Sequence, residues 1–404
     1  MNVNEYAVEN YPVRDLPLGA RAFVTMLARI KVGSLTLIDP LGRSMLFGKQ
    51  GEWPHAQLQI HDWRAAWLLM RQGDIGFAQA YREFWVDSPD LVSLFRLAIK
   101  NEDAVHAMHG SAWALMFKRV IHWVMRDNNR RGSRRNILAH YDLGNDFYRL
   151  WLDASMSYSA AIFGTNVEGD LERAQLAKYD RLLDMIDAQP GQHILEIGCG
   201  WGAFALRAAE RGLKVTGVTL SDEQLRWAKE RVQSAGLDSQ VNLSICDYRD
   251  IQGQFDHVVS IEMFEAVGLR HWPTFFKTLH RLIKPGGRAA IQTIDIANEF
   301  FNGYVKGTDF IQQYIFPGGM LPCPSRFETL ANQAALKIED EFSFGLDYAE
   351  TLNRWLQRFE ARLPEIAELG FDDQFVRIWR MYLTYCEAGF REHRTDVKQW
   401  LLKK

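Results

Sequence analysis

The stretch from His193 to Gly202 reads H-I-L-E-I-G-C-G-W-G, and it decides the fold class. An apolar run ends in Gly198, Gly200 and Gly202, and a helical pattern follows. A buried strand that leads through a glycine-rich turn into a helix presents backbone N–H groups and a helix N-terminus to a ligand. The stretch therefore predicts the nucleotide-type cofactor site of an α/β sheet.

The spacing of the glycines narrows the kind of cofactor. The order G-x-G-x-G departs from the dinucleotide fingerprint G-x-G-x-x-G, and it lacks the Gly-Lys-Ser/Thr of a phosphate loop. Glu196 stands two residues before Gly198, where a carboxylate would repel a pyrophosphate and attract an ammonium group. This favours a cationic nucleoside. The pattern E-x-G-x-G resembles the first motif of class I S-adenosylmethionine-dependent methyltransferases.

From residue 179 onward, strands and helices alternate regularly. This βαβα order predicts an α/β fold with a doubly wound, mostly parallel, seven-stranded Rossmann-like sheet. The ligand is expected at the carboxyl ends of its strands. We expect strands at 193–197, 214–219, 241–246, 255–261 and 288–294, and helices at 203–211, 222–235 and 271–283.

The N-terminal region follows a different pattern. Alternating residues from Ser34 to about Ile60, interrupted by glycines, indicate short strands and hairpins, and helical spacing begins at Trp63. We expect a smaller mixed α+β domain over residues 1–127 and a catalytic domain over 128–404. Lipid binding or formation of a homodimer is expected of the first domain from its position and from the arginine cluster at its end.

The composition indicates an ordinary globular protein. The 404 residues are 47% hydrophobic and 24% charged, and the net charge of −3 argues against a general nucleic-acid binder. The four cysteines show neither C-x-x-C spacing nor a pairing pattern, so we expect a reducing compartment and no metal site. With no signal-peptide or membrane-spanning pattern, a cytoplasmic location is expected.

A cluster of basic residues follows a tryptophan-rich segment at 113–125. Next to an apolar helix, such a cluster can rest on an anionic membrane surface, and each basic side chain contributes about 1 kcal/mol near acidic lipid. This predicts peripheral association with the inner face of the membrane. The alternative is a solvated linker whose basic residues complement a helix dipole. The cluster consists of Arg126, Arg130, Arg131, Arg134 and Arg135.

Polar residues at the next two strand ends complete the expected cofactor site. Thr219, Ser221 and Gln224 follow the strand at 214–219 and would meet the ribose hydroxyls. Asp247 would accept a hydrogen bond from the adenine amino group, and Tyr248 would offer a stacking face. For Asp247, the alternative is a turn cap.

Six motifs then occur in order: H-Y-D-L-G-N-D-F-Y at 140–148, M-S-Y-S at 156–159, L-E-I-G-C-G-W-G at 195–202, G-V-T-L-S at 217–221, M-F-E-A-V-G at 263–268 and Y-I-F-P-G-G at 314–319. Together they resemble the cyclopropane-fatty-acyl-phospholipid synthase family, which includes the mycolic acid cyclopropane synthases. The resemblance implies methyl transfer from S-adenosylmethionine to an unsaturated acyl chain of a phospholipid, with a cyclopropane as product. It also implies that Tyr141, Tyr158 and Ser159 contact the cofactor.

The resemblance further implies a bound bicarbonate as base, held by a glutamate, a histidine, a tyrosine and backbone amides. By motif, the glutamate is Glu265 and the tyrosine is Tyr382. The family's cysteine after Tyr-Ser is Ala160 here, and its histidine before Thr-Ile is Gln292, which can donate a hydrogen bond but carries no charge. Bicarbonate would therefore be held weakly. Glu262 is the alternative carboxylate, and its other interpretation is a solvated residue at a helix start.

Methylation of an alkene creates a carbocation, which aromatic faces stabilise without trapping it. We expect Tyr304, Tyr314 and Phe316, set among glycines and Pro317, to form a wall for the acyl chain, while many other aromatic residues fill the core.

Other outcomes stay open. If the cation loses a different proton, the product is a methyl- or methylene-branched chain. A small-molecule methyltransferase would share the cofactor fold, although S-I-E-M-F at 260–264 differs from the N/D-P-P-Y/F of amino-group methyltransferases. A non-catalytic lipid-binding module is the remaining alternative.

Overall fold

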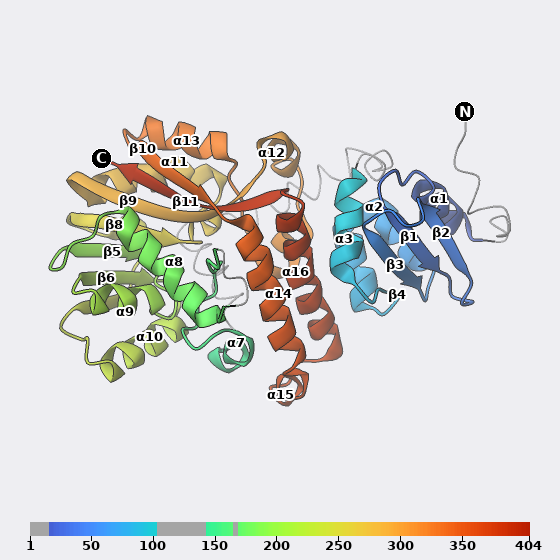
Figure 1. The fold of residues 1–404 in the computed structure, drawn as a ribbon, viewed down its shortest axis with the longest axis horizontal. Helices are drawn as coiled ribbons and strands as arrows, with labels where there is room; N and C mark the ends of the chain where they lie inside the picture. Colours follow the sequence, from blue (N-terminus) through green and yellow to red (C-terminus); the bar gives the residue numbers. More distant parts are fainter. Residues whose placement is uncertain (1–15, 103–142, 165–168) are drawn as a thin grey trace. The chain divides into compact units, whose positions relative to one another are not determined.

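The computed structural model describes residues 16–102, 143–164 and 169–404. The chain divides into two compact units, which Figure 1 labels by element. The first unit contains Met1–Lys118 and Ala367–Glu392, and the second contains Arg119–Ile366 and His393–Lys404. The expected boundary near residue 128 lies outside the described residues, as do the arginine cluster and Tyr141.

The first unit contains a four-stranded sheet of order β2-β1-β3-β4. Strand β1 pairs antiparallel with β2 and parallel with β3, and β4 pairs antiparallel with β3. Buried and partly exposed residues alternate along β3, as expected for a strand with one face on a core. The elements are β1 (Ser34–Ile38), β2 (Ser44–Gly48), β3 (His55–Ile60), β4 (Val86–Asp87), α1 (Leu18–Leu27), α2 (Arg64–Arg82) and α3 (Leu91–Lys100).

Helix α16 (Asp373–Arg391) belongs to this first unit. The two domains expected from the sequence, 1–127 and 128–404, would place this helix in the catalytic domain. The Arg377 guanidinium donates to the carbonyls of Tyr81 and Val86, the latter at 2.7 Å. Tyr385 packs edge to face on Phe95 of α3. The division is therefore discontinuous, because the apolar face of α16 is buried against helices from the start of the chain.

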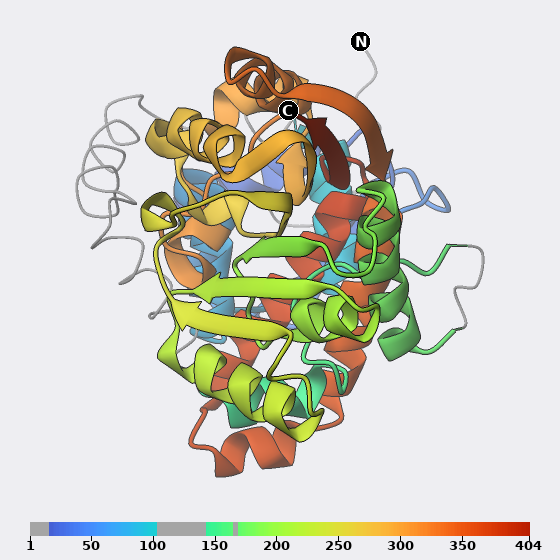
Figure 2. The ribbon, with the colours of Figure 1, turned by 90° about the vertical axis from the view of Figure 1, so that its left-hand side faces the viewer.

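The second unit contains a seven-stranded sheet of order β10-β11-β9-β8-β5-β6-β7 (Figure 2). The strands from β9 to β7 are parallel to their neighbours, and only β11 and β10 pair antiparallel. The predicted doubly wound, mostly parallel sheet is confirmed. Its strands are β5 (His193–Ile197), β6 (Lys214–Thr219), β7 (Val241–Ile245), β8 (Phe255–Ile261), β9 (Ile283–Ile296), β10 (Lys337–Ser343) and β11 (Thr395–Lys403).

Both faces of this sheet are buried, because successive residues of its strands enter different cores. Leu195 of β5 and Val258 of β8 lie in one core, and their neighbours Ile194 and Val259 lie in the other. Two-sided burial is typical of parallel sheets covered by helices. The helices of the unit are α7 (Asn145–Trp151), α8 (Leu171–Met185), α9 (Ala203–Glu210), α10 (Asp222–Ser234), α11 (Trp272–Leu282), α12 (Asn298–Tyr304), α13 (Pro324–Gln333) and α14 (Gly345–Glu360), and α15 (Leu363–Glu368) leads out of it.

Among the described helices, none combines the length and the apolar character that crossing a bilayer requires.

Candidate active site

The glycine-rich turn follows β5 as the sequence predicts. Gly198 has φ +88°, Gly200 +49° and Gly202 +82°, which are angles that L side chains rarely adopt. A Cβ atom at Gly198 would stand only 2.9 Å from Cγ of Met263. At Gly198 the turn is therefore a close-fitting cradle with no room for a larger side chain.

Glu196 supplies the acid of this cradle. The residue is buried, and its Oε2 atom has no hydrogen-bond partner among the residues that the structure describes. Desolvation raises the pKa of the carboxyl to about 8. A buried carboxyl that lacks a partner is costly, so the position fits the ammonium group of S-adenosylmethionine.

The polar residues after β6 are buried together and bond to one another. Ser221 caps α10 by accepting from the N–H of Gln224 at 3.3 Å, and the Thr219 hydroxyl lies 3.1 Å from Oε1 of Gln224. The carbonyl of Val218 accepts from the N–H groups of Gly198 and Cys199, which ties the end of β6 to the glycine turn. The ribose contacts expected of the three residues remain predictions.

Asp247 forms an ion pair that the sequence analysis missed. Its two oxygens accept from Arg249, with Nε to Oδ1 at 2.8 Å and Nη2 to Oδ2 at 2.6 Å, and Oδ1 also caps the turn. Tyr248 packs edge to face against Phe275, and burial raises the pKa of its hydroxyl to about 12. The turn-cap alternative therefore describes Asp247 in this structure, and contact with adenine stays a prediction.

Tyr158 lies in a cluster of aromatic rings. Its ring centroid is 5.4 Å from those of Tyr148, Trp151 and Trp355 and 6.4 Å from that of Phe316. The π faces of such rings favour a nearby cation.

The hydroxyl and the carbonyl of Ser159, the residue after Tyr158, are both hydrogen-bonded to side chains of α8. Its hydroxyl accepts from Nζ of Lys178, and its carbonyl accepts from Nε2 of Gln175 at 2.8 Å. Its predicted side-chain contact with the cofactor would have to compete with Lys178.

Glu262 is the centre of the candidate catalytic site. It follows β8 with φ +48°, a strained angle for a residue other than glycine. Oε1 accepts from the Ala160 N–H at 2.9 Å and from Nε2 of Gln292 at 2.8 Å, and Oε2 accepts from the Tyr348 hydroxyl at 2.7 Å. Desolvation raises the pKa of Glu262, and Lys178 opposes the rise.

Glu265 lies on the 3-10 turn just beyond. Its Oε1 accepts from the Ile294 N–H at 2.5 Å and from the Thr293 hydroxyl at 3.0 Å. Its buried Oε2 has no partner within the described parts of the chain. Desolvation, followed by the charge of Glu262, raises the pKa of Glu265 to about 8. Burial and the neighbouring carboxylate therefore both favour the protonated form of Glu265.

The structure brings three residues of the predicted base site together, but the tyrosine that contacts them is Tyr348 and not the predicted Tyr382. Ala160 and Gln292 meet on Glu262, and Oε1 of Gln292 accepts from Nε2 of Gln399 of β11 at 3.0 Å. Tyr382 instead lies on α16 in the first unit. The hydroxyl on Glu262 comes from Tyr348 of α14.

The three residues predicted as an acyl-chain wall have different surroundings. The Tyr304 hydroxyl accepts from the Leu321 N–H and from Nε2 of Gln312, both at 3.2 Å, which indicates a structural contribution. Tyr314 packs on Phe310. Only Phe316 reaches the aromatic cluster, through Tyr158.

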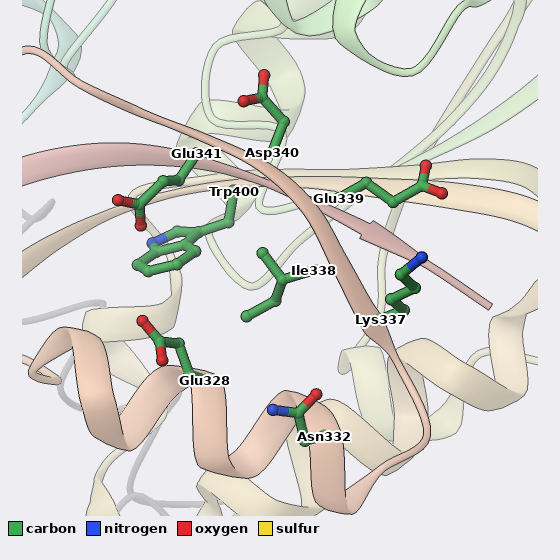
Figure 3. Close-up of a pocket in the computed structure, with 8 residues that line it drawn as sticks. All are labelled: Glu328, Asn332, Lys337, Ile338, Glu339, Asp340, Glu341 and Trp400. Carbon is green, nitrogen blue, oxygen red and sulfur yellow. The ribbon is translucent and has the colours of Figure 1, made fainter.

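A surface cavity of about 460 Å³ lies elsewhere in the second unit, between α13 and the edge of the sheet (Figure 3). None of its lining residues belongs to the site, and exposed charges on β10 are typical of a protected edge strand. The cavity is lined by Glu328, Asn332, Lys337, Ile338, Glu339, Asp340, Glu341 and Trp400. Across the described ranges, no group of His, Cys, Asp and Glu side chains could hold a metal ion.

Comparison with known proteins places the chain in a family. The chain is 41% identical over 349 residues to the tuberculostearic acid methyltransferase of Mycobacterium tuberculosis, a match that covers 82% of this chain and 79% of that protein. It is 33% identical over 341 residues to the cyclopropane-fatty-acyl-phospholipid synthase of Escherichia coli, covering 82% and 83% of the two chains.

The fold is similar to solved structures as well. The crystal structure of a mycolic acid cyclopropane synthase complexed with SAH and CTAB matches with a TM-score of 0.63 and 32% identity, covering 67% of this chain and 98% of that one. The family described as mycolic acid cyclopropane synthetase matches residues 128–400. The chain therefore belongs to the mycolic acid cyclopropane synthetase family and is an S-adenosylmethionine-dependent methyltransferase.

Proposed function

We propose that the protein methylates the double bond of an unsaturated fatty acyl chain of a phospholipid, with Glu262 as the base that completes the reaction. The observation that carries this proposal is the set of three donors on Glu262. The backbone N–H of Ala160, the side chain of Gln292 and a tyrosine hydroxyl all end on its carboxylate.

These donors correspond to the groups that the family resemblance assigns to bicarbonate. They are the amide after Tyr-Ser, the side chain before Thr-Ile, and a tyrosine. In this chain the anion that they hold is part of the protein. A tethered carboxylate needs no dissolved anion, and its position does not depend on the weak grip of an uncharged glutamine.

The remaining groups fit the earlier step. S-adenosylmethionine supplies an electrophilic methyl group. Glu196 and the glycine turn would hold its ammonium end, and the rings around Tyr158 would stabilise the positive charge that methylation leaves on the acyl chain. Glu262 then accepts one proton, which returns the acyl chain to neutrality.

The proton that Glu262 takes decides the product. Loss of a proton from the new methyl group, with closure of a C–C bond, gives a cyclopropane. A hydride shift before that loss gives a methylene-branched chain, and loss of a proton from the chain gives a methyl-branched alkene. The built-in base and the 41% identity to a tuberculostearic acid methyltransferase support a branched product over the cyclopropane predicted from sequence.

Lipid analysis of cells that express the chain tests the proposal. Phospholipid acyl chains should gain the mass of one CH₂ group, and cells that express Glu262→Gln should show little of this product. A cyclopropane and a methylene chain have equal mass, but only the alkene takes up hydrogen under mild catalytic hydrogenation. If the lipids gain no CH₂ but the purified protein binds S-adenosylhomocysteine in calorimetry, a small-molecule substrate is favoured. If the lipids gain no CH₂ and the protein does not bind S-adenosylhomocysteine, a non-catalytic module is favoured.

A further inference from the structure

Lys178 of α8 is an amine buried inside the second unit, and the reaction outlined above does not use it. Its side chain is fully enclosed, with 0% of its surface exposed. Nζ donates to the Ser159 hydroxyl and to Oε1 of Gln175, the latter at 2.5 Å, and it lies 4.5 Å from the ring centroid of Tyr179. A buried ammonium group is costly, so its retention calls for a specific contribution.

Lys178 is connected to Glu262 through two consecutive residues, Ser159 and Ala160. Lys178 and Gln175 hold the hydroxyl and the carbonyl of Ser159, and the next backbone N–H, that of Ala160, donates to Glu262. The N–H of Ala161 donates to the Thr351 hydroxyl of α14 at 3.1 Å. Helix α8 therefore fixes the backbone turn that aims one of the three donors.

The charge of Lys178 also reaches Glu262. Desolvation raises the pKa of Glu262, and the ammonium group of Lys178 is the largest influence that lowers it. Burial lowers the pKa of Lys178 to about 8, and the charges of Glu262 and Asp153 oppose this. The other ionisable groups here are Glu265 and Tyr348 beside Glu262, and Tyr179 on α8.

We infer that Lys178 is a positioning residue for the base, which holds the Ser159–Ala160 turn against Glu262 and places a positive charge near the Glu262 carboxylate. This inference rests on the proposed function, since it assumes that Glu262 accepts the proton. Lys178 acts on the base through Ser159 and through its charge.

The variant Lys178→Met removes the charge and keeps the length of the side chain. Without the ammonium group, the pKa of Glu262 rises further, so the acid limb of the kcat profile should move up by about one pH unit, and kcat at a pH on that limb should fall about tenfold. KM and affinity for S-adenosylhomocysteine should stay unchanged. Ser159→Ala keeps the charge and should lower kcat about threefold with an unchanged pH midpoint.

Arg181→Met is the matched control, because it removes a cation from the same helix. Arg181 lies over the ring of Phe342 at the sheet edge, and among the described residues it forms neither a hydrogen bond nor an ion pair with Ser159 or Glu262. This variant should keep the wild-type profile. A folded Lys178→Met with the wild-type kcat and acid limb would overturn the inference. If that variant does not fold, wild-type kcat in Ser159→Ala would overturn it.

A measurement without turnover separates this inference from the proposed function. The infrared carboxyl band that Glu262→Gln removes reports the protonation of Glu262, and it should titrate at higher pH in Lys178→Met. An inactive wild-type enzyme, or full activity in Glu262→Gln, refutes the proposed function. An identical titration of the band in wild type and Lys178→Met refutes the contribution of Lys178.

Discussion

The hydroxyl of Tyr348 donates a hydrogen bond to Oε2 of Glu262 at 2.7 Å. Tyr348 lies on α14, and Glu262 follows β8, so a helix from late in the chain reaches the carboxyl end of a central strand. Oε1 already accepts from Ala160 and Gln292. Donors from three separate segments therefore fix the carboxylate before any substrate arrives, and a preorganised group of this kind costs no reorganisation during the reaction.

The wild-type enzyme is expected to be indifferent to bicarbonate, because Glu262 takes the donors that would hold it. Glu262→Ala should lower kcat by about 10²-fold or more, since general-base catalysis is lost. Added bicarbonate should restore part of this activity by occupying the vacated space between Ala160, Gln292 and Tyr348. Sodium chloride at equal ionic strength is the control. Dependence of the wild-type rate on bicarbonate, in buffers freed of carbon dioxide, would contradict the assignment.

Gly198→Val should abolish binding of S-adenosylhomocysteine. Gly198 has φ +88°, and a Cβ atom there would stand 2.9 Å from Met263, so the turn must move. Gly191→Val is a matched control for backbone strain, because Gly191 has φ +87° and no atom lies within 4 Å of its added Cβ. Calorimetry measures affinity, and thermal unfolding confirms the fold. Equal loss of affinity in both variants would show that strain alone, and not the cradle, explains the effect.

Glu196→Gln should make the cofactor-free protein more stable at alkaline pH while weakening cofactor binding. Desolvation raises the folded-state pKa of Glu196 from 4.5 to about 8. The folded protein therefore binds this proton more tightly than the unfolded chain, and the contribution is full below pH 4.5 and is lost as pH rises to about 8. Glutamine carries no proton to lose. Urea unfolding at pH 5 and pH 8 should show a variant advantage of a few kcal/mol at pH 8 only.

Replacement of Arg130, Arg131, Arg134 and Arg135 by glutamine should weaken binding to anionic vesicles by a few kcal/mol at low salt and by less at high salt. This prediction rests on sequence alone, because the segment lies outside the described residues. Replacement of the same four residues by lysine keeps the charge and should preserve binding. Equal sedimentation of wild-type and glutamine proteins with vesicles at both salt concentrations would identify the segment as a solvated linker.

The sheet around the glycine turn could be predicted because its signals are local. The bounds of β5 and β6 agree with the expected strands, and α9 ends at Glu210, one residue before the prediction. Strands β10 and β11 were not located. Strand β11 pairs antiparallel with β9 and β10, whose residues are far away in the sequence, so no turn or short spacing marks the pairing.

The candidate site could be predicted only at residues that lie in a recognisable motif or next to one in the sequence. Motifs locate Gln292 and Ala160, and Glu262 is singled out by its position three residues before Glu265. In the structure Ala160 and Gln292 both donate to Glu262. Tyr348 and Tyr382 both lie on amphipathic helices, and a motif match cannot tell which helix reaches the end of β8, because that depends on packing between remote segments. A buried Lys178 is similarly invisible, since lysine at helical spacing normally indicates a solvated face.

Because the first unit is built from two separate parts of the chain, it cannot complete its fold early in synthesis on the ribosome. Its sheet and first three helices leave the exit tunnel early. Helix α16, which packs on Phe95, and Glu392, which pairs with Arg96, are translated after every strand of the seven-stranded sheet except β11. Until then the N-terminal part of the first unit carries an uncovered apolar surface, which is a target for chaperones and a source of aggregation. Ribosome-stalled chains should therefore become resistant to protease in this part only after α16 has emerged.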